Sequence, residues 1–582
     1  GYSLAAQDIE NNTDAFIGDN DSKYLVKTGE TLSQIASKYG IDVEQLADAN
    51  DIEDPNLIKV GDLLVIPYSK GIIKADDLEV DARSDGQIDS IAIGLAAASN
   101  ADPADGPGKF DRFKQSLEDN QNKLIGWIGE KLNAKDQKPA QTPKFGIGIS
   151  GSTAYNKVNL ANNAYISNAV IDLSENESRL SVDAVNDTDI FSISGAGSLI
   201  MAKNPNNKFS TGIAGSFTYN EINNANTALI EESHILGADN ISINSLNGGE
   251  IISIAAGLEV NTSADQNKAA SLAGSASIND INNEIKSEIN DSVIKGKENA
   301  GQRYAALNAY DRSQIGSGGG SLTWGGVAGF GAAVTFNKIQ NDVQASLSGT
   351  ALFHFDKLTV HGISASRIIA GGAVFGLAAA DKSLFFNGSI INNQIDNSTS
   401  AQIVSDSAVY TTQEVDILAR DLEYGNQALN LFDQVLDKND GNTAEKTQLD
   451  YKGEAIFGDG LDYQVKKDDS LEIIADKYGV TVEEIRKKNN LSADEDISEG
   501  DELLIPIIDR GNSIFAGAGN VQINPRIGSK NVGISFAYNE IANDFNALIA
   551  DSTVRTVQDT AGEDSINLNA ISGSRITGYA VG

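Results

Sequence analysis

Cysteine is absent from this 582-residue chain, and histidine, proline, methionine and tryptophan are scarce. Without cysteine there are no disulfides, thiolate metal ligands or catalytic thiols. The three histidines, His234, His354 and His361, are too scattered to form a recognisable motif. We therefore expect no catalytic residue, no metal and no cofactor. Nine prolines against 56 glycines suit stacked strands joined by tight turns.

Positive charge and long apolar runs are also scarce. There are 44 basic and 81 acidic residues, giving a formal net charge of −37. A polyanion of this size repels nucleic acid and anionic lipid, so we expect neither as a partner. The longest uncharged stretch, residues 313–337, is glycine-rich and its apolar residues are interrupted. It predicts a buried turn of a repeat rather than a membrane span.

What the chain does contain is a repeat. A phrase close to Asn-x-Ile/Val-x-Asn recurs at intervals of 64, 59, 58, 56 and 146 residues, with a weaker copy at Gln7. Its copies begin at Asn156, Asn220, Asn279, Asn337, Asn393 and Asn539. A second phrase, in which apolar and polar residues alternate as in a β-strand, follows most copies. It occupies residues 180–184, 241–245, 358–362, 415–419 and 566–570.

The repeat predicts a mainly β fold, a right-handed parallel β-helix in which each unit holds several short strands and like residues stack in ladders. Asparagine suits such ladders because its amide can bond to the next amide, and it also tolerates the left-handed backbone of corners. The alternative is a row of antiparallel sandwich domains of about 60 residues each. Variable unit lengths and the lack of capping elements favour the β-helix.

The two ends of the sequence resemble two halves of one unit. Joining residue 582 to residue 1 would place Gln7 50 positions after Asn539, close to the other intervals. Uncapped solenoid ends expose unpaired strand edges. We therefore expect either an internal piece of a larger protein or a subunit that associates head to tail into filaments.

Both long intervals contain a copy of one small module. Residues 24–67 and 463–506 correspond without a gap at an offset of 439, so that Tyr24 matches Tyr463 and Asn50 matches Asn489. In the first copy, apolar residues at helical spacing follow a short apolar strand, and Thr31 is a candidate helix cap. Two helices flanked by two strands, a βααβ unit, are predicted.

At Val26-Lys-Thr-Gly-Glu-Thr-Leu32, Ile35-Ala-Ser-Lys-Tyr-Gly40 and Val60-Gly-Asp-Leu-Leu-Val-Ile-Pro67 the module resembles the lysin-motif (LysM) family. The resemblance implies binding of N-acetylglucosamine-containing glycan, such as peptidoglycan or chitin, in a shallow groove between two loops. The implied glycan-binding residues are Thr28, Gly29, Glu30, Thr31, Ile52, Asn56, Leu57 and Ile58.

The second module departs from this pattern in both loops. Lys467-Asp468-Asp469 replaces Thr-Gly-Glu, and residues 493–497 introduce three further acids. Carboxylates desolvate poorly against a neutral sugar, so the second copy is expected to bind more weakly or to serve structure.

A further insert is expected at about 103–143, where Phe110, Phe113, Leu117, Trp127 and Leu132 fall at helical spacing. The predicted organisation is β-helix at 1–22, LysM module at 23–68, β-helix at 69–461 with this helical insert, a second LysM module at 462–508 and β-helix at 509–582.

The repeating host resembles the shafts of filamentous-haemagglutinin-like adhesins and autotransporter passengers through its Ala-Gly-Ser-x-x-Tyr-Asn-x-Ile phrases. The resemblance implies a bacterial extracellular or cell-surface fibre whose modules grip glycan. Two other functions stay open: a polysaccharide-degrading β-helix enzyme that uses paired carboxylates, and a structural fibre with non-binding modules.

Overall fold

The computed structural model describes most of the shaft and part of each module. The described residues are 1–18, 22–26, 30–39, 42–48, 50, 52, 58–59, 63–66, 72–99, 145–173, 178–201, 209–262, 268–298, 303–422, 461–465, 470–471, 474–475, 482, 485–486, 489, 491–492, 497–498, 500–505, 511–523, 528–556 and 565–581. The expected helical insert at about 103–143 lies outside these residues.

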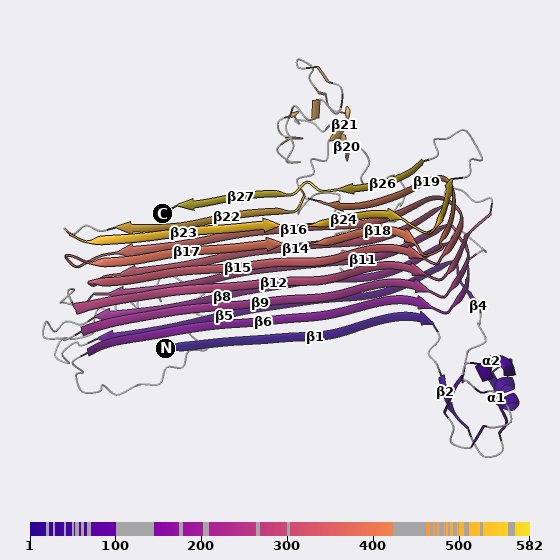
Figure 1. Ribbon diagram of the computed structural model, residues 1–582, viewed down its shortest axis with the longest axis horizontal. Helices are drawn as coiled ribbons and strands as arrows, with labels where there is room; N and C mark the ends of the chain where they lie inside the picture. Colours follow the sequence, from indigo (N-terminus) through magenta and orange to yellow (C-terminus); the bar gives the residue numbers. More distant parts are fainter. Residues whose placement is uncertain are drawn as a thin grey trace.

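The shaft is a flattened parallel β-helix made of two long sheets (Figure 1). The first sheet contains β1 (Tyr2–Gly18), β6 (Phe145–Ser167), β9 (Phe209–Glu231), β12 (Ala269–Asn290), β15 (Ala328–Ser348), β17 (Leu384–Ile395), β18 (Ser398–Val404), β23 (Lys530–Ile541) and β24 (Asp544–Ile549).

The second sheet carries the return pass of each coil. It contains β4 (Ile72–Lys74), β5 (Asp77–Ser99), β7 (Val170–Asp172), β8 (Arg179–Met201), β10 (His234–Ala238), β11 (Asn240–Asn261), β13 (Val293–Gly296), β14 (Tyr304–Trp324), β16 (Ala351–Leu377), β19 (Ala408–Asp421), β22 (Ser513–Ile523), β25 (Thr553–Thr556), β26 (Ser565–Ile571) and β27 (Arg575–Val581). The described residues thus form seven coils, each crossing both sheets once.

Strand pairing confirms the β-helix and excludes the row of sandwiches. Neighbouring coils pair in parallel, for example β9 with β12 and β8 with β11. The expectation of several short strands per unit was wrong, because single strands run for up to 27 residues. The inward–outward alternation continues through all 23 residues of β9 without a break, whereas β16 contains register shifts between Phe353 and Lys357. Each coil therefore has two long sides.

The asparagine ladder is confirmed residue by residue. Register pairs Gln7 with Asn156, then Asn156 with Asn220, Asn220 with Asn279, Asn279 with Asn337, Asn337 with Asn393, and Asn393 with Asn539. From Asn156 onward, each side-chain amide nitrogen donates to the amide oxygen of the next coil at 2.7 Å. The amides from Asn220 onward therefore satisfy one another between the two sheets, whereas the Gln7 side-chain nitrogen donates to the Asp89 carbonyl and does not reach Asn156 Oδ1.

Corners follow a different rule from the one expected. The left-handed residues of one corner are Asn168, Glu232, Asp291, Gly349, Ser405, Asp406 and Asp551, so asparagine is not the repeated corner residue. A serine or threonine follows in each later coil. In four of these coils its hydroxyl accepts from a backbone amide of the coil before: Ser233 from Ala169, Ser292 from Ser233, Thr350 from Ser292 and Ser407 from Thr350.

The interior alternates between apolar and polar sections. One cluster stacks isoleucines from both sheets, including Ile222, Ile281 and Ile339 of the first sheet and Ile251 and Ile315 of the second. The asparagine and the isoleucine of the repeated Asn-x-Ile phrase thus both point inward.

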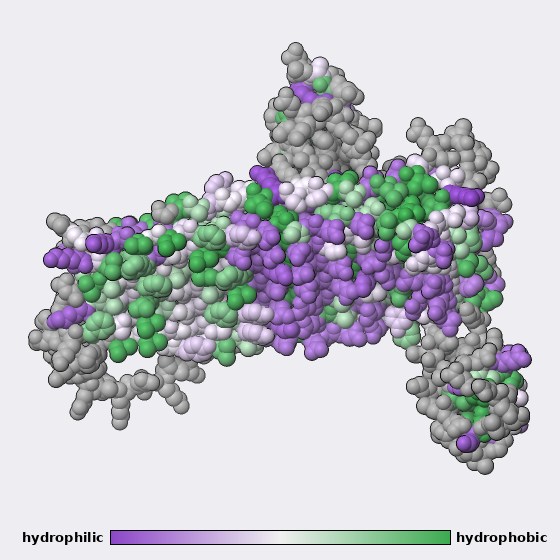
Figure 2. All heavy atoms as spheres, viewed as in Figure 1, coloured by the Kyte–Doolittle hydropathy of each residue, from purple (hydrophilic) through white to green (hydrophobic). Residues whose placement is uncertain are grey.

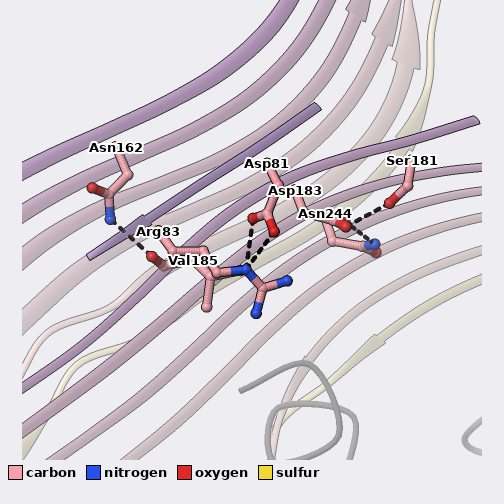
Figure 3. Close-up of polar contacts among 7 residues, drawn as sticks. All are labelled: Asp81, Arg83, Asn162, Ser181, Asp183, Val185 and Asn244. Atoms are coloured by element: carbon pink, nitrogen blue, oxygen red, sulfur yellow. Dashed lines mark hydrogen bonds and ion pairs between the residues drawn. The ribbon is translucent and has the colours of Figure 1, made fainter. Parts of the chain in front are cut away.

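Polar contacts join coils and sheets near the first coils (Figure 3). Asn244 Nδ2 donates to Asp183 Oδ1 at 2.7 Å, and Asn162 Nδ2 crosses to the Val185 carbonyl of the other sheet at 3.0 Å. Arg83 pairs with Asp81 two residues away.

The uncharged stretch 313–337 covers the end of β14, a bend at residues 325–327 and the start of β15. It is a repeat segment as expected, but only its inward side is buried, since Trp324, Phe330 and Phe336 are 48%, 52% and 42% exposed. Among the described residues, no helix combines the length and apolar character needed to cross a bilayer.

Candidate functional site: two small modules on a β-helical shaft

The first module stands between β1 and β4 in chain order. It contains β2 (Ser22–Leu25), α1 (Leu32–Tyr39), α2 (Val43–Asp48) and β3 (Leu63–Ile66). The two strands pair antiparallel, with Tyr24 opposite Leu64. The predicted strand–helix–helix–strand order is confirmed.

The start of α1 is fixed by a reciprocal cap at Thr31. The Gln34 amide donates to Thr31 Oγ1 at 3.3 Å, and the Thr31 amide donates to Gln34 Oε1 at 3.1 Å. This capping box satisfies two amides that a helix N-terminus otherwise leaves unpaired. Asp42 caps α2 in a similar way, since its Oδ1 accepts from the Glu44 amide at 2.8 Å.

Asn50, which the two copies share, has a structural role. Its side-chain nitrogen donates to the Leu46 carbonyl at 2.8 Å, and Asn489 makes the same bond to Ile485 at 2.8 Å. Each asparagine satisfies a carbonyl near the end of its helix.

The module core explains why the spacing of apolar residues is the same in both copies. Its buried residues are Val26, Leu32, Ile35, Ala36, Leu46, Ala47 and Leu64. The second core contains Val465, Leu471, Ile474, Ala475, Ile485 and Leu503, each 439 positions later than its counterpart. There, β20 (Leu461–Gln464) pairs with β21 (Glu502–Ile505) in the equivalent register.

Four of the eight predicted glycan contacts fall on described residues. Ile52 and Ile58 are partly buried and pack against the same cluster as Leu32. Thr31 is exposed at the start of α1 and Glu30 is partly exposed before it. Thr28, Gly29, Asn56 and Leu57 lie outside the described residues. The sequence offered no signal that Thr31 and Gln34 would form a reciprocal pair beyond the spacing of a cap and its third helical residue.

The second module is mounted differently. It stands between β19 and β22 in chain order, and both strands pair with the unbroken strand β16. Across the break, the Asp421 carboxylate accepts from the Asn512 and Gly573 amides at 3.2 and 2.8 Å. Ser572 and Ser574 hydroxyls donate to the same carboxylate. The buried side chain of Asp421 thus ties the interrupted coil to the next one.

No group of three or more histidine, aspartate or glutamate side chains positioned to hold a metal ion occurs in the part of the chain that the structure describes. The buried histidine, His361, hydrogen-bonds through Nε2 to Asp416 Oδ2 of the neighbouring coil at 3.0 Å, as a residue of a β-helix coil does.

Comparison with known proteins identifies the modules. The LysM domain family matches residues 24–67 and 463–506, so the chain carries two LysM domains, at the predicted positions. One curated relative, the N-acetylmuramoyl-L-alanine amidase XlyA of Bacillus subtilis, is 49% identical over 49 residues, 8% of this chain and 16% of that protein. The amidase XlyB of the same organism is 39% identical over 61 residues, 10% of this chain and 19% of that protein.

This chain therefore spans less than a fifth of the length of either amidase. No solved structure matches the chain.

Proposed function

We propose that the protein is an extracellular structural and adhesive fibre whose LysM domains bind N-acetylglucosamine-containing glycan of the peptidoglycan or chitin type. The observation that carries the proposal is the mounting of two modules with the same core and strand register on one rod. The similarity of the modules to segments of two cell-wall amidases supports a peptidoglycan-type ligand. The resemblance to adhesin shafts supports the fibre, and the proposed role is binding rather than catalysis.

Glycan contact in the first module is assigned to the loop ending at Thr31 and to the apolar pair Ile52 and Ile58. The half-buried isoleucines pack against the cluster that contains Leu32, the residue after Thr31. They would offer an apolar contact for a sugar face, and Thr31 would offer a polar group for an acetamide. The added acids of the second module's loops make it the weaker binder.

A sedimentation assay with insoluble peptidoglycan and with chitin tests this assignment on the full chain. Replacing residues 24–67 by a short Gly-Ser linker should remove most binding, and replacing 463–506 should remove less. Ile58→Ala should weaken binding about tenfold, as loss of a central apolar contact does. Lys59→Ala, at the exposed neighbour, is the control. Equal effects of the two substitutions, or unchanged binding without the first module, would disprove the assignment.

Fibre formation is assigned to end-to-end stacking of coils. Within the described residues, β1 pairs only with β6, and β23 pairs only with β17. Both therefore present an open edge that can accept a further parallel strand. Gln7 stands at the ladder position of the first coil, where its amide can continue the bonding that Asn539 receives from Asn393. Electron micrographs should show fibres of constant width, and Asp8→Pro on the β1 edge should shorten them.

A second candidate function, hydrolysis of a polysaccharide, is favoured by one acidic group on the outer face of the second sheet. Asp85, Asp187, Asp189 and Glu250 lie on adjacent strands there. Burial, and then the charges of Asp187, Glu250 and Asp85, raise the pKa of the Asp189 carboxyl to about 6. A carboxyl that stays protonated near neutral pH suits a general acid beside an ionised partner.

An assay for released oligosaccharide separates the two functions. Glycan binding without product supports the fibre. Product that disappears in Asp189→Asn but persists in Asp89→Asn, an exposed neighbour on the same face, supports hydrolysis and overturns the non-catalytic proposal.

A further inference from the structure

One end of the rod, where the long strands of the first sheet begin and those of the second sheet end, has apolar outer faces. Figure 2 shows hydrophobic residues gathered over this third of the visible face, at the left of the view, with hydrophilic residues over the middle. Outward positions of a strand in a solvated sheet are ordinarily polar. This region therefore needs an explanation that the glycan-binding modules do not supply.

On the first sheet, the apolar residues form one continuous row across six coils. This first-sheet ridge consists of Ile149, Ile213, Leu272, Phe330, Phe386 and Val532, which pair in register from strand to strand. Their exposed fractions lie between 38% and 58%. Because six successive coils repeat the same apolar outward position, the row is a periodic surface rather than a scatter of exposed side chains.

Beside the ridge runs a row of small residues two positions along each strand. This first-sheet groove consists of Gly215, Gly274, Ala332 and Gly388. It is closed at one end by the Tyr2 side chain, which lies against Gly151, and at the other by Ile534. A Cβ placed on Gly215 would meet no atom within 4 Å, so packing within the chain does not require glycine there. A second row, Phe217, Ala276, Val334 and Ile390, borders the groove on its other side.

The second sheet carries matching relief at the same end. Its ridge is continuous over Leu258, Leu322, Phe375 and Val521. Leu95 of the first coil is separated from this ridge by Gly197. The groove consists of Gly195, Ala256, Gly320, Ala373 and Gly519 and ends at Ile93 of the first coil. Leu95, Leu258, Phe375 and Val521 are 67%, 46%, 44% and 48% exposed. Opposite faces of the rod therefore present a ridge beside a groove with the same spacing between coils.

We infer that these faces are the lateral interface between copies of this chain, with the first-sheet face of one rod packed on the second-sheet face of the next. The inference rests on the proposed fibre and specifies how its rods associate sideways. Two arguments favour a second copy as the occupant. The relief repeats coil by coil, which fits a partner with the same strand spacing, and it occurs on both faces, which fits an interface that propagates.

The available area is adequate for such an interface. Six strands about 4.8 Å apart span about 24 Å, and nine residues at about 3.3 Å each span about 30 Å, which defines a face of about 700 Å². That is comparable with the roughly 800 Å² that each partner of a stable protein interface buries. The apolar rows carry little charge, so the net charge of −37 opposes association mainly through long-range repulsion, which salt screens.

Complementation between two variants tests the heterologous arrangement. Sedimentation velocity of the full chain at moderate salt should show laterally associated species, and micrographs should show rods wider than one β-helix. Phe330→Glu on the first-sheet face and Phe375→Glu on the second-sheet face should each reduce association to single-width rods. An equimolar mixture should recover paired rods, because each variant retains the face that the other lacks.

The matched control is Gln340→Glu, which adds the same charge to β15 at an exposed outward position away from the ridge; it should associate as the parent does. Gly215→Val should weaken association by filling the groove, whereas non-specific stickiness would increase with the added apolar surface. Circular dichroism of each variant establishes that the β-helix is intact.

Single-width parent rods at all salt concentrations, or a mixture that fails to recover pairing, would overturn the inference. So would cross-links showing that residues 100–144 of the same chain, or added lipid vesicles, occupy the ridge instead. Rod length reports end-to-end stacking and rod width reports lateral packing, so failure of this inference is distinguishable from failure of the proposed fibre.

Discussion

Replacing Asn279 by alanine should destabilise the shaft more than most single substitutions, because it breaks the asparagine ladder on both sides. Asn279 accepts from Asn220 and donates to Asn337, both at 2.7 Å, and its exposed fraction is 1%. Alanine leaves a buried donor on Asn220 and a buried acceptor on Asn337 without these partners. Each such loss costs about 1–3 kcal/mol, so the expected decrease in unfolding free energy is about 2–6 kcal/mol.

Two matched variants should lose less stability than the Asn279 variant, each by a different amount. Asn539→Ala, at the end of the ladder, removes only the bond that Asn393 donates and should cost about half as much. Asn282→Ala, at an exposed position of the same strand as Asn279, should change stability by less than about 0.5 kcal/mol. Urea unfolding followed by far-ultraviolet circular dichroism measures all three. An Asn279 variant no less stable than the Asn282 variant would refute the energetic role of the ladder.

Three further predictions concern titration, capping and ion pairing. Burial raises the pKa of the Glu259 carboxyl to about 8, above its ordinary value near 4.5, so the folded state holds this proton more tightly and loses stability as pH rises from about 4.5 to 8. Glu259→Gln should therefore be more stable than the parent by about 3–5 kcal/mol at pH 9, with the advantage vanishing near pH 4; urea midpoints across pH measure this, and a pH-independent difference would contradict it. Thr31→Ala should remove the capping box and destabilise the first module by about 1 kcal/mol, which should appear as faster amide hydrogen exchange in α1. Thr31→Ser keeps the hydroxyl and should keep the slow exchange. Equal exchange rates in the two variants would show that the cap does not stabilise α1. Asp356 contacts Arg303 at 2.9 Å, and both side chains are largely buried, so Asp356→Ala should lower the free energy of unfolding by about 3–5 kcal/mol. Thermal unfolding measures this loss against Lys295→Ala, which removes an exposed ion pair. Similar melting temperatures of the two variants would show that the buried pair contributes nothing to stability.

The architecture of the shaft was predictable because the residues that stack in ladders recur as the same residue types at regular intervals in the sequence. The second phrase also stacks in register, with Leu180, Ile241, Leu358, Val415 and Ile566 on one inward row. The coil between Ile241 and Leu358 contributes Ala305 to this row, and the sequence pattern missed it because alanine carries no strand signal. Its place is set by the strands on either side rather than by its own preference.

The flattened shape was not predictable from the repeat. Glycine and serine runs suggested frequent turns, yet residues 313–324 remain in one strand, β14. Pairing with neighbours on both sides outweighs the low strand propensity of glycine. The apolar ridges were also missed, because their members are separated by a whole coil in sequence and each residue taken alone is an unremarkable exposed side chain.

For the candidate glycan site, the residues were predicted from the family resemblance. Residue type and helical periodicity predicted the structural role of only some of them. The cap at Thr31 follows from its residue type and its position before an apolar helical pattern. The position of Ile58 against the module core depends on how a loop folds back, and the helical and strand periods on either side of that loop do not encode this.

The interruption of one strand by the second LysM domain has a consequence for how such rods diversify. Strand β16 runs unbroken beside both β19 and β22. Pairing with β16 therefore fixes the alignment of these two strands, whatever domain is inserted between them. A foreign domain can enter the middle of a coil without shifting the coils beyond it, provided that an anchor such as Asp421 closes the gap. The shaft can thus accept an inserted domain in almost any of its coils, and we expect relatives with the same β-helix to carry different inserted domains.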